Sequence, residues 1–250
     1  MLRGLAASSA VPSMAIAGVF CLGALQGTLA QAQEAPQRAT AAPLAFKVEW
    51  VRPASQADTK ARYTPIQQNI TDPKVEIKYY GAAAKQILTT GQPGSDLTPY
   101  GVWSGTAEGP FAITFAYKDS YLDFTGLANV KWPVKTSAFH VVRPVIKVDG
   151  TLLVGDVTFA SVPKLGMHEL SLTNVRWVKL DPTRVVTLNS GPAAANPNNE
   201  VWAPAPDLSK IEEIGFADLM PGSGHGQGGY IQLGNIEVYA KTSPRTAPAK

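Results

Sequence analysis

The feature that most constrains this chain is a series of short segments in which apolar and polar residues alternate. From Tyr100 onward they recur at roughly 8–12-residue spacing, separated by Gly, Pro, Asp and Asn, as in all-β sandwiches and barrels. Val130, Trp132 and Val134, for example, alternate with Lys131 and Lys135, which is typical of a half-buried strand. Helical periodicity is almost absent. The pattern therefore predicts an all-β chain, a β-sandwich or jelly roll.

Two segments refine this prediction. Phe139–Val148 is predicted to be one long strand, and Asp149-Gly150 after it is a strong hairpin signal. Ala82–Leu88 is predicted to form one or two helical turns. We expect a single domain over residues 44–241, of which residues 100–241 are the jelly-roll-like part.

The N-terminal segment Met1–Ala32 has the three parts of a secretory signal peptide. Arg3 supplies the positive charge, an apolar run follows, and Ala30–Ala32 supplies a small-residue cleavage site. The run is shorter than the ~20 apolar residues of a membrane span. Cys21, the one cysteine of the chain, lies in this run, and bulky Phe20 before it disfavours lipidation. We expect a secreted or periplasmic protein without cysteine chemistry.

The remaining composition limits the partners. Residues 33–43 and 242–250 are rich in Ala and Pro and are predicted to be a flexible leader and a flexible tail. The net charge is +3, and the basic residues are spread without a run of five or more. Nucleic acid and membrane surfaces are therefore not expected as partners. With 45% hydrophobic residues the chain can build a core without disulfides, and we expect a monomer.

The C-terminal part resembles a known class of domain. Asp207–Phe216 and Leu233–Tyr239 resemble the last two strands of galactose-binding-like jelly rolls, and Asp123–Trp132 resembles an early element of them. The resemblance extends to non-catalytic carbohydrate-binding modules and to secreted bacterial proteins. It implies a binding module for carbohydrate, although a fold alone does not establish a function.

Aromatic residues are the first candidates for a sugar-binding site, because an indole face can stack on a pyranose ring. Trp132 and Trp177 lie in alternating strands and are predicted to be core. Trp103 and Trp202 have no core periodicity around them, so we expect them to be exposed stacking surfaces.

The strand around Arg143 carries the second group of candidates. Alternation places Arg143 and Lys147 on one face and His140 on the other. An Arg in a Val-rich strand is either ion-paired or lines a groove. Its candidate partners are Asp123, Asp156 and Glu169. In the groove alternative, Arg143 donates to sugar hydroxyls or to a uronic carboxylate.

A glycine-rich segment, Pro221–Tyr230, contains the third candidate, His225. It includes Gly224-x-Gly226-x-x-Gly229, the spacing of a dinucleotide fingerprint. That fingerprint requires a following helix, whereas a strand is predicted here, so a nucleotide site is rejected. The segment is either a plain connector or a loop in which His225 meets a ligand. The Pro-rich segment Asn189–Pro206 is long enough to be a functional loop as well.

Catalytic motifs are weak by comparison. Carboxylates that could form a hydrolytic pair are present, but sequence cannot show that two of them face each other. No Gly-x-Ser-x-Gly and no HExxH occurs, and the three histidines are scattered, so a zinc site is not expected. We expect no cofactor, with calcium as the alternative left open.

The prediction is a non-catalytic carbohydrate-binding protein, with a glycan hydrolase or lyase and a cell-envelope interaction module as alternatives. The predicted ligand-binding residues are Trp103, His140, Arg143, Trp202 and His225.

Overall fold

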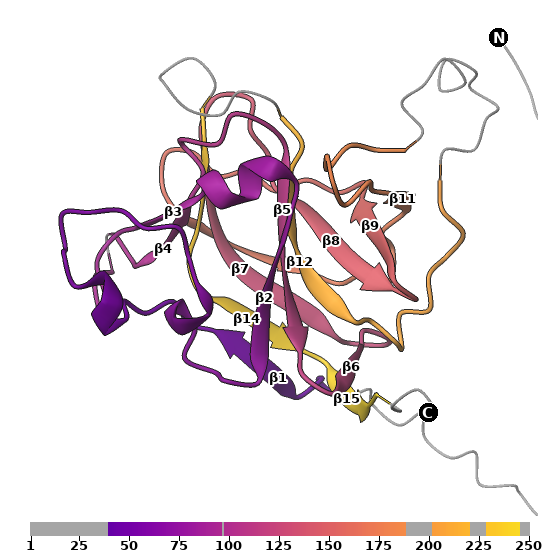
Figure 1. Ribbon diagram of the computed structural model, residues 1–250. Helices are drawn as coiled ribbons and strands as arrows, with labels where there is room; N and C mark the ends of the chain where they lie inside the picture. The colour runs from indigo at the N-terminus through magenta and orange to yellow at the C-terminus, as the bar shows by residue number, and fades with distance from the viewer. Residues whose placement is uncertain (1–39, 97, 189–201, 221–228, 246–250) are drawn as a thin grey trace, which may run out of the picture. The chain divides into compact units, whose positions relative to one another are not determined.

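Strands dominate the computed structural model, which describes residues 40–96, 98–188, 202–220 and 229–245 (Figure 1). All of these residues belong to the unit Ala39–Lys250. Helix is limited, in this part of the chain, to the short 3-10 turns η1 (Ala54–Gln56), η2 (Gln67–Asn69) and η3 (Ala82–Gln86). The all-β prediction is confirmed. The predicted signal peptide, Cys21 and His225 lie outside the described residues.

The strands form two larger antiparallel sheets and one small one. The seven-stranded sheet has the order β1-β14-β7-β13-β4-β3. Strands β14 and β13 pair with successive parts of β7, and β10 pairs with β7 as well. The six-stranded sheet has the order β11-β9-β8-β12-β5-β2. Strands β15 and β6 form a separate two-stranded ribbon.

The bounds of the strands are as follows. The seven-stranded sheet contains β1 (Leu44–Val48), β3 (Leu88–Thr90), β4 (Gly101–Trp103), β7 (Asn129–Thr136), β10 (Gly166–Leu170), β13 (Ile231–Leu233) and β14 (Ile236–Tyr239). The six-stranded sheet contains β2 (Val75–Tyr80), β5 (Phe111–Tyr117), β8 (Arg143–Val148), β9 (Thr151–Gly155), β11 (Trp177–Lys179) and β12 (Glu213–Asp218). The ribbon consists of β6 (Ser120–Asp123) and β15 (Lys241–Pro244).

The main core lies between the two large sheets. Strand β7 alternates as its sequence predicts, and Trp132 at its centre is fully buried. Trp132 packs against Phe159 at 5.6 Å between ring centroids, and Trp177 is buried as well. Burying a side chain of the size of Phe contributes ~1.5–3 kcal/mol, so these buried rings stabilise the packing of the two sheets. The β-sandwich prediction, with Trp132 and Trp177 as core residues, is confirmed.

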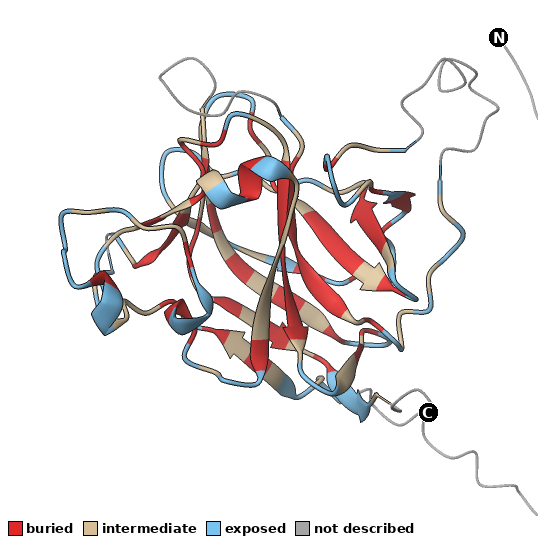
Figure 2. Cartoon of the chain, in the orientation of Figure 1, coloured by how far each residue is buried: buried red, intermediate tan, exposed pale blue. Residues whose placement is uncertain are grey.

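The six-stranded sheet is unusual because its outer face is apolar too. Strands β5 and β12 are buried along nearly their whole length (Figure 2). On the outer face a second cluster includes Val145, Val154 and Val178, with Val185 packed onto it from the segment after β11. This cluster is the apolar floor on which the candidate site is built.

Two sequence predictions need correction, and two are confirmed. Strand β8 begins at Arg143, not at Phe139, because a turn with Ala138 at a φ of 53° precedes it and leaves Phe139 86% exposed. Residues 242–244, expected in the flexible tail, belong to β15 because the backbone of this strand pairs with β6. The hairpin at Asp149-Gly150 is confirmed by positive φ angles at both residues, and the predicted turns after Gly81 are η3.

Candidate functional site

A pocket lies on the outer face of the six-stranded sheet, at the end where β11, β9 and β8 meet. Its volume is about 490 Å³, which is within the ~300–1,000 Å³ of small-molecule sites. Its lining combines an apolar floor with an aromatic ring and three charged side chains. The lining residues are Val141, Arg143, Val154, Gly155, Asp156, Arg176, Val178, Thr187, Trp202, Leu219 and Met220.

Strand pairing explains how these residues meet. Val145 pairs with Val154 in β8 and β9, and Val154 pairs with Val178 in β11, so three valines form a continuous row. One residue before β11, Arg176 donates its backbone N–H to Asp156 Oδ1 at 3.0 Å. The polar groups therefore lie beside the apolar row, at the same end of the strands.

Trp202, Arg176 and Asp156 form a connected group in the pocket. The guanidinium carbon of Arg176 lies 4.1 Å from the centroid of the Trp202 ring, and its Nε donates to Asp156 Oδ2 at 2.9 Å. This hydrogen bond holds the pKa of Asp156 below its usual range. Ala203 N–H donates to the Trp177 carbonyl at 2.7 Å, which ties the backbone next to Trp202 to β11. Trp202 is 41% exposed, as its sequence surroundings predicted.

Arg143 lies in the same pocket, on the face that alternation predicted. Its Nη1 donates to the carbonyls of Gly155 and Asp156 at 3.4 and 3.3 Å. The expected carboxylate partners are engaged elsewhere: Asp156 binds Arg176, Asp123 accepts from Thr125, and Glu169 pairs with Lys131 at 3.6 Å. Of the two alternatives, the structure favours the one in which Arg143 lines a groove.

His140 and Asp218 form a buried pair behind the rim of the pocket. Nδ1 of His140 lies 2.6 Å from Asp218 Oδ2, and both side chains are almost completely buried. Asp218 also accepts the backbone N–H of Met220 at 2.9 Å. Burial raises the pKa of Asp218. The residues that follow them, Val141 and Leu219, line the pocket, so the pair fixes the rim and His140 is not itself in the lining.

Trp103 lies on the other sheet. It is half-buried on β4, with Arg62 4.4 Å from its ring centroid and Tyr230 at 6.1 Å between centroids. The structure thus brings together Trp202 and Arg143 of the five predicted residues. Sequence reasoning missed Arg176, although its position beside core residue Trp177 could have placed it on the outer face.

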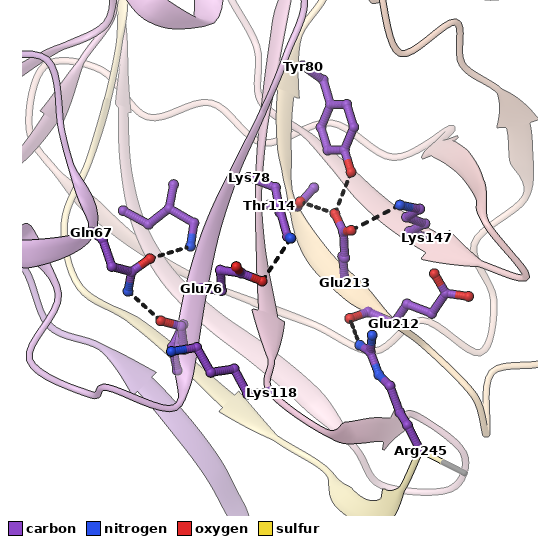
Figure 3. Close-up of polar contacts among 12 residues, drawn as sticks. Gln67, Glu76, Lys78, Tyr80, Thr114, Lys118, Lys147, Glu212, Glu213 and Arg245 are labelled. Atoms are coloured by element: carbon purple, nitrogen blue, oxygen red, sulfur yellow. Dashed lines mark hydrogen bonds and ion pairs between the residues drawn. The ribbon is translucent and has the colours of Figure 1, made fainter. Parts of the chain in front are cut away.

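A polar cluster lies on the same sheet face, at the pairing of β12 with β5 and β8 (Figure 3). Glu213, which is 4% exposed, accepts hydrogen bonds from Tyr80 at 2.7 Å, from Thr114 at 2.5 Å and from Lys147 at 3.2 Å. Burial raises the pKa of the Tyr80 hydroxyl, which keeps it a donor. Sequence analysis placed Lys147 on this face and did not find its partner Glu213.

The pocket does not present a facing carboxylate pair in the part of the chain that the structure describes. Asp156 is the one carboxylate among its described lining residues, Asp218 is buried against His140, and Asp123 is the last residue of β6. Among the described residues, no group of three or more His, Cys, Asp or Glu side chains is gathered as a metal site would require, and no helix is long and apolar enough to span a membrane.

Comparisons with known proteins give similarity at the level of structure. No family model and no curated protein matches the chain. The fold is similar to the family 11 carbohydrate-binding module of a cellulosomal cellulase from Clostridium thermocellum, with 14% identity, a TM-score of 0.39, and coverage of 68% of this chain and 89% of that chain. The same module in complex with a β-1,3-1,4-mixed-linked tetrasaccharide matches with the same identity and TM-score, over 68% and 90% of the two chains. An exo-β-agarase matches with 10% identity and a TM-score of 0.35, over 72% of this chain and 24% of that chain.

Proposed function

We propose that this protein binds carbohydrate, without converting it, in the pocket formed by Trp202, Arg143, Arg176 and Asp156. The observation that carries the proposal is the half-exposed indole of Trp202, which lies in a pocket with an apolar floor and charged hydrogen-bonding groups. Sugars present apolar C–H faces and polar hydroxyls together. A site for them needs an aromatic surface beside fixed donors and acceptors.

The polar groups of the pocket can both donate hydrogen bonds to sugar hydroxyls and accept hydrogen bonds from them. The described contacts use Nη1 of Arg143 and Nε of Arg176. The other guanidinium N–H groups have no partner among the described residues and can donate to sugar oxygens. Asp156 is held ionised by Arg176 and is an acceptor for a sugar O–H. These groups are fixed before a ligand arrives, which lowers the entropy lost on binding.

A thermal melt against a panel of soluble glycans tests this function. A glycan at about a hundred times its dissociation constant adds ~2.7 kcal/mol to the free energy of unfolding. For a chain of this size the melting temperature then rises by very roughly 5–10 °C. A rise with unchanged reducing ends supports a binding protein, and a rise with newly formed reducing ends indicates a hydrolase. No rise across a broad panel contradicts the proposal and favours an interaction module of the cell envelope.

The proposal includes export of the chain and action as a monomer. The signal-like segment Met1–Ala32 supports export. N-terminal sequencing of the protein recovered outside the cytoplasm is expected to begin at Gln33. A mature protein that retains Met1 contradicts cleavage, and a mass in solution of two or more chains contradicts the monomer.

A further inference from the structure

A second cavity, of about 400 Å³, lies at the edge of the seven-stranded sheet, away from the Trp202 pocket. It lies between residues 52–62, strand β3 and the turn that follows it, and Gln232 of β13. Arg52, Lys60 and Arg62 line it, together with threonine hydroxyls and the amides of Gln92 and Gln232. No carboxylate side chain is among its described lining residues.

The two arginines are held in place by groups that carry no net charge. Arg52 Nη1 donates to the carbonyls of Asp58 and Gln56 at 3.0 and 3.4 Å, and its guanidinium lies 5.1 Å from the Tyr100 ring centroid. The Arg62 guanidinium lies 4.4 Å from the Trp103 centroid. Carbonyls and rings orient a cation without neutralising it, so the positive charges remain.

Some cations of this protein are paired, as Arg176 is with Asp156 and Arg184 with Asp181. In the described chain, Arg52, Lys60 and Arg62 form no ion pair. Asp58, which lies between Arg52 and Lys60 in the sequence, accepts the backbone N–H of Lys60 at 2.8 Å. Its carboxylate forms no ion pair with Arg52, Lys60 or Arg62. Three like charges around one cavity repel one another, and an anion placed among them removes that cost.

From this arrangement we infer a second binding site, selective for a saccharide that carries a carboxylate or a sulfate. Planar guanidinium groups fixed in orientation match the paired oxygens of either oxyanion. The neighbouring threonine and glutamine groups match the hydroxyls of the remaining sugar. This site is separate from the proposed pocket at Trp202 and does not depend on it.

Calorimetric titration of the full chain at low salt tests the inference. The probes are a trigalacturonate, a sulfated galactan trisaccharide, the uncharged galactan trisaccharide and inorganic sulfate. We expect the two charged saccharides to bind at least about tenfold more tightly than the uncharged one, since hydrogen bonds to charged groups are the strong ones. The affinity for them should fall as salt is added. The oxyanion that the site prefers is the one whose saccharide binds more tightly.

Variants distinguish binding at this site from nonspecific attraction of the saccharide to the positive charge of the protein. Lys60→Ala and Arg62→Ala should each weaken binding of the charged saccharide at least about tenfold. Lys179→Ala, which removes one exposed positive charge from β11 on the other sheet, should leave it unchanged. Lys60 is exposed, so its variant tests the site even where Arg62→Ala disturbs Trp103. Binding of an uncharged glycan at Trp202, measured on the same variants, should not change.

Equal binding of charged and uncharged trisaccharides would overturn the inference, as would equal losses in Lys60→Ala and Lys179→Ala. Sulfate that binds as tightly as the sulfated trisaccharide would overturn the saccharide part of it. None of these results bears on the Trp202 pocket, whose own test uses uncharged glycans.

Discussion

The guanidinium of Arg176 lies 4.1 Å from the ring centroid of Trp202, and the same side chain is bound through Nε to Asp156. One side chain thus orients the aromatic surface and the acceptor of the pocket together. The backbone N–H of Arg176 donates a second hydrogen bond to Asp156, at Oδ1. The geometry of the proposed sugar site therefore depends on a residue that the sequence analysis did not select.

Replacing Arg176 should affect both of its partners. In Arg176→Ala the pKa of Asp156 should rise toward its ordinary value, because the hydrogen bond that favours the carboxylate is lost. Glycan affinity should fall, because Trp202 loses the group that orients it. NMR titration of the Asp156 carboxyl measures the change in pKa. Calorimetric titration with a glycan that the wild type binds measures the change in affinity. An unchanged Asp156 pKa would refute the pairing.

The buried pair of His140 and Asp218 predicts a pH dependence of stability. Burial raises the pKa of Asp218 in the folded state above the ordinary value of ~3.9. Such a carboxyl favours folding below its unfolded pKa, and this contribution is lost as the pH rises through the folded pKa. The free energy of unfolding of the wild type, relative to Asp218→Asn, should therefore fall with rising pH. Urea denaturation between pH ~4 and ~6, above the ordinary aspartate pKa of ~3.9, measures it. A difference that grows with pH would contradict the raised pKa.

Glu213 should matter for stability far more than an exposed glutamate that is also paired with a lysine. Glu213→Ala removes the partner of Tyr80, Thr114 and Lys147 on a buried face, and it should cost ~3–5 kcal/mol of unfolding free energy. Glu76→Ala is the matched control, because the Glu76 side chain is 43% exposed and pairs with Lys78. Its cost should stay within ~1 kcal/mol. Similar losses in the two variants, by urea denaturation, would show that the Glu213 cluster is not structural.

The hairpin between β8 and β9 allows the cost of a left-handed backbone conformation to be measured without a steric clash. Gly150 has a φ of 70°, and a Cβ added there meets no atom within 4 Å. Gly150→Ala should therefore destabilise the fold by about 1 kcal/mol through its left-handed backbone alone. Asp149→Gly, at a φ of 47°, should cost less because glycine adopts this conformation freely. A Gly150→Ala variant as stable as the wild type in thermal melts would argue against this turn.

Local pattern was enough to predict strand β7 and the turn between β8 and β9. Val130, Trp132 and Val134 alternate because one face of β7 meets the core, and a period of two is visible in a single segment. In β5, by contrast, the sequence could not show which residues point to which side, because nearly all of them are buried and the outer face of the sheet is apolar as well. Alternation alone cannot show such a second cluster.

The candidate site could be predicted only in part, because it depends on contacts between distant segments. Trp202 and Arg143 stood out, one because no core periodicity surrounds it and the other as a charge in an apolar strand. Their shared pocket depends on the pairing of β8, β9 and β11, which brings Asp156 next to Arg176. Trp103 carried the same local signal as Trp202, yet β4 places it on the other sheet. Single-residue environment does not distinguish these two tryptophans, whereas strand order does.

Those two tryptophans supply the most direct test of the account. Each has an arginine over its ring, but Trp202 lines the pocket and Trp103 does not. With an uncharged glycan that shifts the melting temperature, calorimetry on Trp202→Ala should show affinity at least about tenfold lower, or ~1.4 kcal/mol. Trp103→Ala, once its melt shows it to be folded, should bind as the wild type does. Wild-type affinity in Trp202→Ala would contradict the proposed site.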